Sequence, residues 1–326
     1  MKALAAGLPV ARRAANSLWC GERPLLPTTL RASGCCLAAG RLRARPEGSP
    51  ESATGGKTAP PEIGGEAVNS RWAEHTWEEV RAAAREGALA VLPCGSTEQH
   101  GPMLPLDTDV RIAQRMAEDG ARVAWERYQV RALVLPVLPF GLASHHLAFA
   151  GTITFEPETY ITLLAEILRS VVRHGFRRIA VVSGHGGNMP GIDLAMAKIV
   201  HEFRDRMALR VAQFNGHQDP EFAARSREMM QDQPSEEQPG IHASRWETSE
   251  TLADRPELVR RERMVRPTLK LAQVPEWTWM THELSETGAF GDPSLAVAEL
   301  GHRTWEAWAE AVGAFLKRLA EAKISD

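Results

Sequence analysis

The sequence predicts an α/β fold of three layers, α/β/α, with a mostly parallel central sheet. From residue 69 onward, short apolar runs alternate with amphipathic segments long enough to form helices. This alternation is typical of parallel strands connected by helices that cover both faces of the sheet. In addition, loops rich in polar residues and glycine follow two of the apolar runs directly. In such sheets, ligands bind beyond the carboxyl ends of the strands.

Local signals place each element in turn. Thr76 and Glu79 have the spacing of a capping box, which predicts a helix over 77–85. The apolar run 88–93 predicts a buried strand, and Thr108 or Asp109 opens the next helix. The segment 216–240 is polar, and we expect it to be an irregular excursion over the site. The remaining predicted strands are 130–140, 177–184 and 208–214. The remaining predicted helices are 157–174, 190–204 and 296–322, and the segment 242–259 is expected to form one helix or two short ones.

Residues 1–68 differ in composition from the rest. Up to Pro46 the chain has many arginines and a single acid, Glu22, and a stretch rich in Gly, Pro, Ser and Thr follows. Such a stretch buries too little apolar surface to offset its ordering entropy. We therefore predict a disordered N-terminal extension and linker over 1–68 and one catalytic domain over 69–326. The arginine-rich part is either an organellar transit peptide or an unstructured extension, so a cytoplasmic location and an organellar one both stay open.

Net charge, hydrophobicity and cysteine spacing exclude several classes of protein. A net charge of −3 gives no electrostatic attraction to nucleic acid, so we expect no nucleic-acid partner. The sequence contains no apolar run long enough to cross a membrane, so we expect no membrane partner either. None of the four cysteines forms a C-x-x-C pair, which argues against a disulfide framework and favours a reducing compartment.

The strongest functional signal is the stretch 92–109, LPCGSTEQHGPMLPLDTD. Glu98, His100 and Asp109 collect there with Asp107 around two prolines and a glycine. Carboxylate and imidazole groups this close repel or desolvate one another unless a cation lies among them, and mixed oxygen and nitrogen ligands suit zinc, manganese or iron. The simpler alternative is a solvated turn with capping acids. Three ligand types converging at one strand end favour the metal site.

The loop SGHGGN adds His185 at the end of another predicted strand. Its glycines allow a sharp bend around a metal or a substrate. A phosphate-binding turn is the alternative, although the loop has neither a GxGxxG pattern nor a Walker lysine. We expect Asn188 either to fix this loop or to contact the substrate.

The segment HASRWETS supplies His242, Trp246 and Glu247. Taken alone, the histidine is more often a helix cap and the glutamate a solvated side chain. We include them as candidate site residues because the other candidate ligands are expected at the same place. His146, in the loop after the second predicted strand, is expected at the mouth of the pocket or as a hydrogen-bonded loop residue. Cys94 is expected to be a small buried residue.

Five motifs, in order, resemble the creatininase family of amidohydrolases: GSTEQHGPMLPLDTD, HHLAFAGTITF, SGHGGN, HASRWETS and SETGAFGDPS. The resemblance covers residues 89–301, nearly all of the predicted domain. It implies the layered α/β/α fold, a dinuclear metal site, hydrolysis of a C–N bond in a small molecule, and a homo-oligomer, often a hexamer.

The resemblance also implies roles for individual residues. Glu98 and His100 would each bind one metal, Asp109 would bridge the two, and His185 would complete the first site. In creatininase proper the histidine loop reads like GHYEN, with a glutamate ligand two places after the histidine. Here that place is Gly187, so Glu247 becomes the expected substitute ligand. This departure puts creatinine itself in doubt as the substrate.

The expected cofactor is therefore a pair of divalent ions per subunit, zinc first, with manganese or iron as alternatives. Two such ions lower the pKa of a bound water and polarise the scissile amide. We expect His242 to be the catalytic proton shuttle, with a ligand role still open, and Glu247 to serve both catalysis and metal binding. Trp246, together with Trp277 or Trp279, would supply apolar or stacking walls. The list of expected substrate contacts comprises Asn188, Trp246 and His146.

Other functions remain open at this point. The same scaffold suits a peptidase of the mycofactocin type or a formamide deformylase. A non-catalytic family member that binds a metal or ligand is a further alternative, although a degenerate site usually loses some of its ligands.

Overall fold

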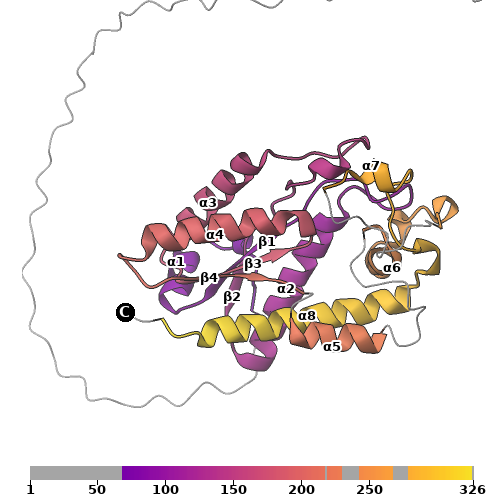
Figure 1. Cartoon of the computed structure of the whole chain (residues 1–326). Helices are drawn as coiled ribbons and strands as arrows, with labels where there is room; N and C mark the ends of the chain where they lie inside the picture. The colour runs from indigo at the N-terminus through magenta and orange to yellow at the C-terminus, as the bar shows by residue number, and fades with distance from the viewer. Residues whose placement is uncertain (1–67, 217–218, 230–241, 267–277, 325–326) are drawn as a thin grey trace, which may run out of the picture. The chain divides into compact units, whose positions relative to one another are not determined.

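The computed structural model describes residues 68–216, 219–229, 242–266 and 278–324, which are coloured in Figure 1. The predicted extension up to residue 67 lies outside these ranges, as does Trp277. The extent of the catalytic domain, 69–326, therefore stays a prediction. Of the four cysteines, the described one is Cys94, which is free and buried.

A parallel four-stranded sheet forms the middle layer, with the strand order β2-β1-β3-β4. Val91 of β1 lies opposite Val134 of β2 on one side and Ala180 of β3 on the other. The all-parallel pairing confirms the predicted fold class. The strands are β1 (Leu89–Cys94), β2 (Ala132–Val134), β3 (Arg178–Ser183) and β4 (Arg210–Phe214).

Helices cover both faces of this sheet. They are α1 (Trp77–Arg85), α2 (Thr108–Tyr128), α3 (Pro157–Arg173), α4 (Met189–Phe203), α5 (Pro220–Met229), α6 (Arg245–Asp254), α7 (Thr281–Leu284) and α8 (Ala298–Glu321). The capping box that begins α1 is present, since the backbone nitrogen of Thr76 donates to Glu79 at 2.6 Å. Pro157 occupies the first turn of α3, where its missing N–H costs nothing.

The protein has a hydrophobic core on each face of the sheet, and alternate residues of β1 pack into one or the other. Leu89 and Val91 pack with residues of α2 and α8, whereas Ala90 and Leu92 pack with residues of α1, α3 and α4. Figure 1 shows α3 and α4 side by side over one face of the sheet and α8 along the other, beside α5. Because successive side chains of a strand point to opposite faces, one central strand holds both outer layers together.

Two predicted segments differ from the structure. The second strand was expected over 130–140, but β2 ends at Val134 because Pro136 and Pro139 cannot donate to a ladder. The segment 216–240 was expected to be irregular, but it contains α5. Phe222 of α5 is 2% exposed and belongs to the core beneath α8. The rest of that segment lies outside the described ranges.

The sheet places two loops at one edge. β1 ends at Cys94 and β3 at Ser183, and these residues are register partners in neighbouring parallel strands. The loops 95–107 and 184–188 therefore leave the sheet together. In the described ranges, every helix is too short or too polar for a bilayer crossing.

Candidate metal centre

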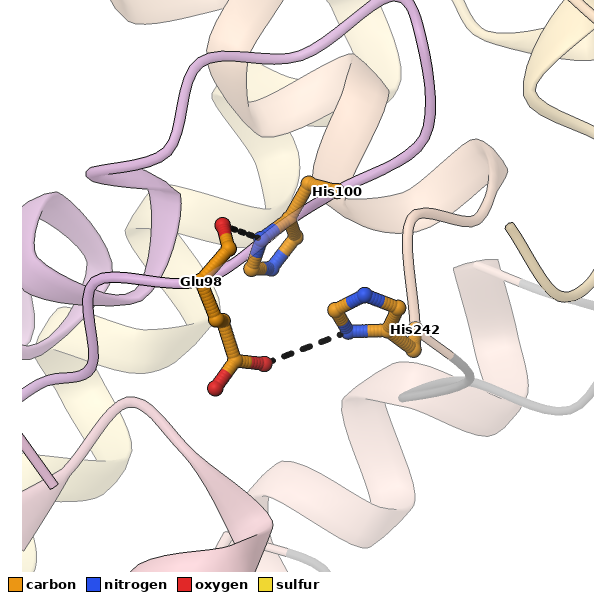
Figure 2. A group of neighbouring side chains, drawn as sticks. All are labelled: Glu98, His100 and His242. Atoms are coloured by element: carbon orange, nitrogen blue, oxygen red, sulfur yellow. Dashed lines mark hydrogen bonds and ion pairs between the residues drawn. The ribbon is translucent and has the colours of Figure 1, made fainter. Parts of the chain in front are cut away.

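The loop after β1 brings Glu98 and His100 into the protein, where both are fully buried. The loop folds back on itself, since the backbone nitrogen of Glu98 donates to the carbonyl of Leu106 at 3.0 Å. Figure 2 shows their side chains beside His242, which comes from a distant part of the chain. The predicted convergence of Glu98 and His100 on one site is present in this geometry.

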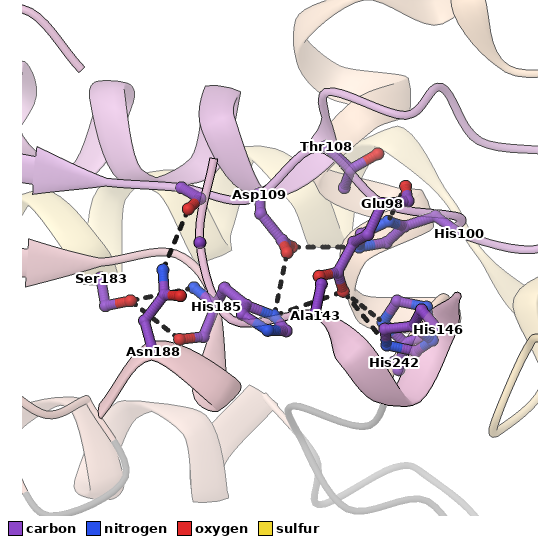
Figure 3. Close-up of polar contacts among 12 residues, drawn as sticks. Glu98, His100, Thr108, Asp109, Ala143, His146, Ser183, His185, Asn188 and His242 are labelled. Carbon is purple, nitrogen blue, oxygen red and sulfur yellow. Dashed lines mark hydrogen bonds and ion pairs between the residues drawn. The ribbon is translucent and has the colours of Figure 1, made fainter. Parts of the chain in front are cut away.

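Asp109, in the first turn of α2, lies between two histidines (Figure 3). Its Oδ1 is 3.0 Å from Nε2 of His100, and its Oδ2 is 3.1 Å from Nδ1 of His185. The carboxylate is 2% exposed. One carboxyl group thus faces a candidate ligand on each side.

Glu98 lies opposite, with three imidazoles around a single oxygen. Its Oε1 is 3.3 Å from Nδ1 of His185, 3.2 Å from Nε2 of His146 and 3.6 Å from Nδ1 of His242. These contacts bring together four of the residues singled out in the sequence.

Two backbone carbonyls orient the candidate histidine ligands. Nε2 of His185 lies 3.0 Å from the carbonyl oxygen of Leu142, and Nδ1 of His100 lies 3.2 Å from that of Glu98. A carbonyl only accepts, so each of these ring nitrogens carries the proton. The other ring nitrogen of each histidine faces Asp109, where it would offer its lone pair to a metal ion once its own proton has left.

Glu247 completes the group from the first turn of α6. Its Oε2 accepts a hydrogen bond from the backbone nitrogen of Ala243 at 2.5 Å and lies 4.0 Å from Nε2 of His100. Ala243 has a φ of 50°, which is unusual for a residue with a side chain. Strained backbone of this kind concentrates at functional sites, and here it directs an N–H toward a candidate ligand.

The donor atoms fit a pair of metal ions. Both carboxylate oxygens of Glu98 and Oδ2 of Asp109 are buried without a hydrogen bond. Imidazole nitrogens lie within ion-pair distance of Oε1 of Glu98 and Oδ2 of Asp109, because buried carboxylates need a positive charge beside them, from protonated imidazoles or from a metal ion. Their nitrogen and oxygen donors suit zinc, manganese or iron. Three groups have donor atoms within 4.8 Å of one another: Glu98, Asp109 and His185; His100, Asp109 and Glu247; and Glu98, His100 and His242.

The pKa values of these buried groups also favour a bound cation. Burial disfavours a charged His100, but the adjacent Asp109 outweighs it and raises the pKa of this imidazole to about 10. Burial also opposes ionisation of Glu98, yet the charge on His185 holds the pKa of this carboxyl well below its usual range. Protonated imidazoles thus neutralise the carboxylates, and a divalent ion would take the place of those protons.

His242 and His146 occupy specific places at this centre. Nε2 of His242 donates to the backbone oxygen of Gln99 at 2.7 Å, and its other nitrogen faces Glu98. It does not cap α6, because the N-cap is Ser244, whose hydroxyl accepts from the nitrogen of Trp246. His146 is 2% exposed, so it lies behind Glu98 and away from the surface. Its contact with substrate stays a prediction.

Asn188 is also fully buried. Its Oδ1 accepts from the nitrogen of Leu142 at 2.8 Å, and its Nδ2 donates to the carbonyl of Gly95 at 2.9 Å. Both ends of the amide therefore join the loops of the site to one another. This arrangement favours the alternative in which Asn188 fixes the loop, and a substrate contact stays a prediction.

The tryptophans differ in their relation to the site. Trp246 is 5% exposed and lines a cavity of about 140 Å³ beside His185 and Glu247. Trp279 lies instead against His145 and Phe290, with ring centroids 6.1 and 5.7 Å apart. Of the two, Trp246 has the better position for the apolar wall predicted from the sequence.

Two residues of this region, Gln99 and Glu250, were not predicted from the sequence. The side-chain nitrogen of Gln99 can donate to Nδ1 of His146 at 2.8 Å, and it lies 2.9 Å from Nε2 of His242, which donates to the backbone oxygen of Gln99. Gln99 therefore contacts both histidines. Its position between Glu98 and His100 in the chain was the available signal. Glu250, one helical turn after Glu247, lines the same cavity as Trp246.

The chain is similar to known proteins over most of its length. The family description "Creatininase: Creatinine amidohydrolase" matches residues 73–316. The mycofactocin precursor peptide peptidase of Mycobacterium tuberculosis is 34% identical over 231 residues, which cover 67% of this chain and 80% of that protein. The creatinine amidohydrolase of Pseudomonas putida is 34% identical over 136 residues, or 39% of this chain and 50% of that protein.

The fold is similar to that of a solved structure named "Creatininase Mn". Its TM-score is 0.67 at 24% identity, and the match covers 78% of this chain and 100% of the other. The family match extends over most of the chain and includes every candidate ligand described above. The protein is therefore a member of the creatininase family, and the two relatives named above, a peptidase and an amidohydrolase, are enzymes that hydrolyse C–N bonds.

Proposed function

We propose that this protein hydrolyses a C–N bond of a small amide with two divalent metal ions bound in each subunit. Glu98, Asp109 and His185 would hold one ion, and His100, Asp109 and Glu247 the other. The observation that carries the proposal is the position of Asp109, whose two oxygens face the ligands of different groups. A carboxylate shared in this way fixes the spacing of two ions.

Bound there, the ions would activate a water and polarise the carbonyl of the amide. The chain itself contributes the orientation of the donors. The carbonyls of Leu142 and Glu98 keep His185 and His100 in the tautomers that ligation needs. Burial keeps bulk water from the two carboxylates, which strengthens their hold on a cation.

His242 is the candidate for moving the proton to the leaving nitrogen. In the metal-free protein, burial and the nearby charge of His100 lower the pKa of His242 well below its ordinary value. The ring is therefore neutral, with its proton on Nε2 and a lone pair on Nδ1. Nδ1 can accept a proton and return it, as general acid–base catalysis requires.

Glu247 takes the place of the ligand that the loop 184–188 lacks. A Cβ on Gly187 would lie 2.4 Å from Nε2 of His185, so this loop has no room for a side chain there. Glu247 reaches the site from α6 instead, held by the nitrogen of Ala243.

A peptide substrate is the second candidate. The 34% identity to the mycofactocin precursor peptide peptidase, over 80% of that protein, favours it. The manganese in the name of the similar creatininase structure supports a divalent ion and leaves zinc and iron to be tested. We further propose a homo-oligomer, on the basis of the family resemblance, and a cytoplasmic or organellar location according to the role of residues 1–68.

The test is to load the metal-free protein with zinc, manganese or iron in turn and to assay cyclic amides, formamides and short peptides. Elemental analysis of each preparation gives the metal content per chain. We expect two ions per chain and hydrolysis in one substrate class. One ion or none would contradict the dinuclear site, and two ions without hydrolysis of any class would favour a non-catalytic binding protein.

A further inference from the structure

Charged side chains join helices α2 and α6 near the candidate metal centre. Asp254 is the last residue of α6, and its two carboxylate oxygens accept from Nε and Nη2 of Arg111 at 2.5 and 2.9 Å. One of these oxygens, Oδ1, also accepts from Nη1 of Arg115 at 2.8 Å. A carboxylate that pairs with both arms of a guanidinium fixes the relative orientation of the two groups. The contact therefore holds the end of α6 against the beginning of α2.

A second ion pair connects the same two helices in the opposite sense. Nη1 and Nη2 of Arg255 donate to Oδ2 and Oδ1 of Asp107 at 2.7 and 3.1 Å. Asp107 is the N-cap of α2, and Arg255 is the C-cap of α6. Nε of Arg255 also lies 3.8 Å from Oδ2 of Asp254, so the two pairs are continuous. We call the connected residues the α2–α6 network: Asp107, Arg111, Arg115, Asp254 and Arg255.

The stability of the separate helices does not explain these charges. Asp254 ends α6, where the helix dipole favours a cation, and Arg111 is the fourth residue of α2, where the dipole favours an anion. Burial opposes ionisation of Asp254, but the hydrogen bond from Arg111 outweighs it and lowers the pKa of this carboxyl. Each of the two charges is thus stabilised chiefly by the other helix.

The same two helices carry two ligands of one candidate metal group. Asp109 lies in the first turn of α2 and Glu247 in the first turn of α6, and His100 completes the group. Glu247 and Asp254 are about two helical turns apart, so they lie on the same side of α6. A shift of α6 relative to α2 would therefore move Glu247 relative to Asp109.

The other candidate group does not depend on α6. Its members Glu98 and His185 follow β1 and β3, which are paired in the sheet, and Asp109 is the third. A shift of α6 would therefore change the group that contains Glu247 and spare this one.

We propose that the α2–α6 network positions Glu247 and thereby sets the affinity of the protein for one metal ion of the pair, the ion of the His100, Asp109 and Glu247 group. The inference rests on the proposed function, because it takes two ions as bound. The five residues of the network act through Glu247, so they are positioning residues for that ion alone.

The test is a metal titration of the full-length protein by calorimetry, with manganese as the probe. Glu247→Gln first identifies the binding step that belongs to the group containing Glu247. Asp254→Asn keeps the size of the side chain and removes its charge, and it should weaken the same step at least tenfold. This is the lower end of the roughly 10- to 100-fold loss that follows removal of an outer contact of a metal site. The other step should stay unchanged.

Asp119→Asn is the matched control. Asp119 accepts from Nε of Arg115 at 3.1 Å, so it pairs with an arginine of the network, but it lies on α2 itself. Both binding steps should therefore stay as they are in the parent protein.

A double variant separates positioning from a general loss of stability. If Asp254 acts through Glu247, Asp254→Asn should not weaken the remaining ion any further in the Glu247→Gln background. A general loss of stability would weaken both ions in either background. If Asp254→Asn does not fold, Arg111→Gln removes the guanidinium that pairs with both carboxylate oxygens and should give the same pattern.

Three results would overturn the proposal: an unchanged Glu247 step in Asp254→Asn, equal weakening of both steps, or a further loss in the double variant. If the parent protein binds two ions, any of these results leaves the proposed function standing. One ion or none in the parent protein would contradict the dinuclear centre, and this inference with it.

Discussion

Nε2 of His185 and the carbonyl oxygen of Leu142 form a 3.0 Å hydrogen bond that lies directly over Gly187. A Cβ on this glycine would be 2.4 Å from the first atom and 2.5 Å from the second. The hydrogen bond and the glycine therefore depend on each other. Because this hydrogen bond orients His185, position 187 has no room for a side chain.

Gly187→Ala should reduce metal content, because the new methyl group would break the hydrogen bond from Nε2 of His185 to the carbonyl of Leu142. This hydrogen bond keeps the proton of His185 on Nε2 and leaves Nδ1 for the metal. Losing such an orienting contact typically costs 10- to 100-fold in metal affinity, so we expect roughly that loss. Elemental analysis and a metal titration measure it. Gly186→Ala is the matched control, since a Cβ there has nothing within 4 Å. Equal affinity in the two variants would show that the hydrogen bond does not support the site.

Asp109→Ala should lose both ions. Its two oxygens face different ligand groups, so removing the carboxylate opens both groups at once. Glu98→Gln and His100→Ala each disturb one of the groups that contain Asp109 and should leave closer to one ion per chain. Elemental analysis after dialysis gives the counts. Two ions retained in Asp109→Ala would exclude a bridging role.

His242→Ala separates a proton shuttle from a ligand. As a shuttle, His242 acts in the reaction, so metal content should stay near that of the parent protein while kcat falls by roughly 10²- to 10⁴-fold. KM should change little, because the interaction matters mainly in the transition state. Joint loss of metal and activity would instead identify His242 as a ligand, as its position beside Glu98 and His100 allows.

Glu250 should make the stability of the protein depend on pH. Its pKa is about 8 in the folded chain, against an ordinary value of 4.5, because burial disfavours the charged form. Between these values the unfolded chain binds fewer protons, so the free energy of unfolding falls as pH rises. The contribution is complete below about pH 4.5 and is lost as pH passes through 8.

Denaturant unfolding at a series of pH values checks this. Glu250→Gln carries no titrating group at this position, so its free energy of unfolding should fall less between pH 5 and pH 8 than that of the parent protein. Parallel curves for the two proteins would mean that Glu250 titrates normally.

Residues 1–68 should be dispensable for folding. Their composition lacks the periodic apolar residues of the remaining chain, and all the core residues described above lie beyond them. A chain that begins at Asn69 should unfold cooperatively on heating and keep its metal. Insoluble protein from this shortened chain would place the domain boundary further toward the N-terminus.

Local signals and one topological rule were enough to predict much of this fold. Helix starts at Thr76 and Pro157 follow from capping and from proline geometry. The edge of a parallel sheet brings the loops of Glu98 and His185 together without any knowledge of contacts. These features depend on neighbours in sequence or on strand order, both of which the sequence contains.

The features that escaped prediction depend on long-range packing. Gln99 contacts His242 across 143 residues, and no local pattern signals that pair. Glu250 has the sequence context of an ordinary helical acid, but it is buried and accepts hydrogen bonds from the indoles of Trp305 and Trp308 on another helix. The core position of Phe222 was likewise hidden by the polar residues around it, since α8 provides the surface that buries it.

The order of the candidate ligands along the chain has a consequence for the synthesis of the protein. Glu98, Asp109 and His185 leave the ribosome well before Glu247, which lies on α6. A growing chain that extends only through β4 already contains one complete group of ligands, while the second lacks a member. For the proposed two-ion site, we therefore expect the first ion to be captured during translation and the second only after α6 has been made. Ribosome-bound chains stalled after β4 should hold at most one ion, and a full complement in such chains would rule out this order of loading.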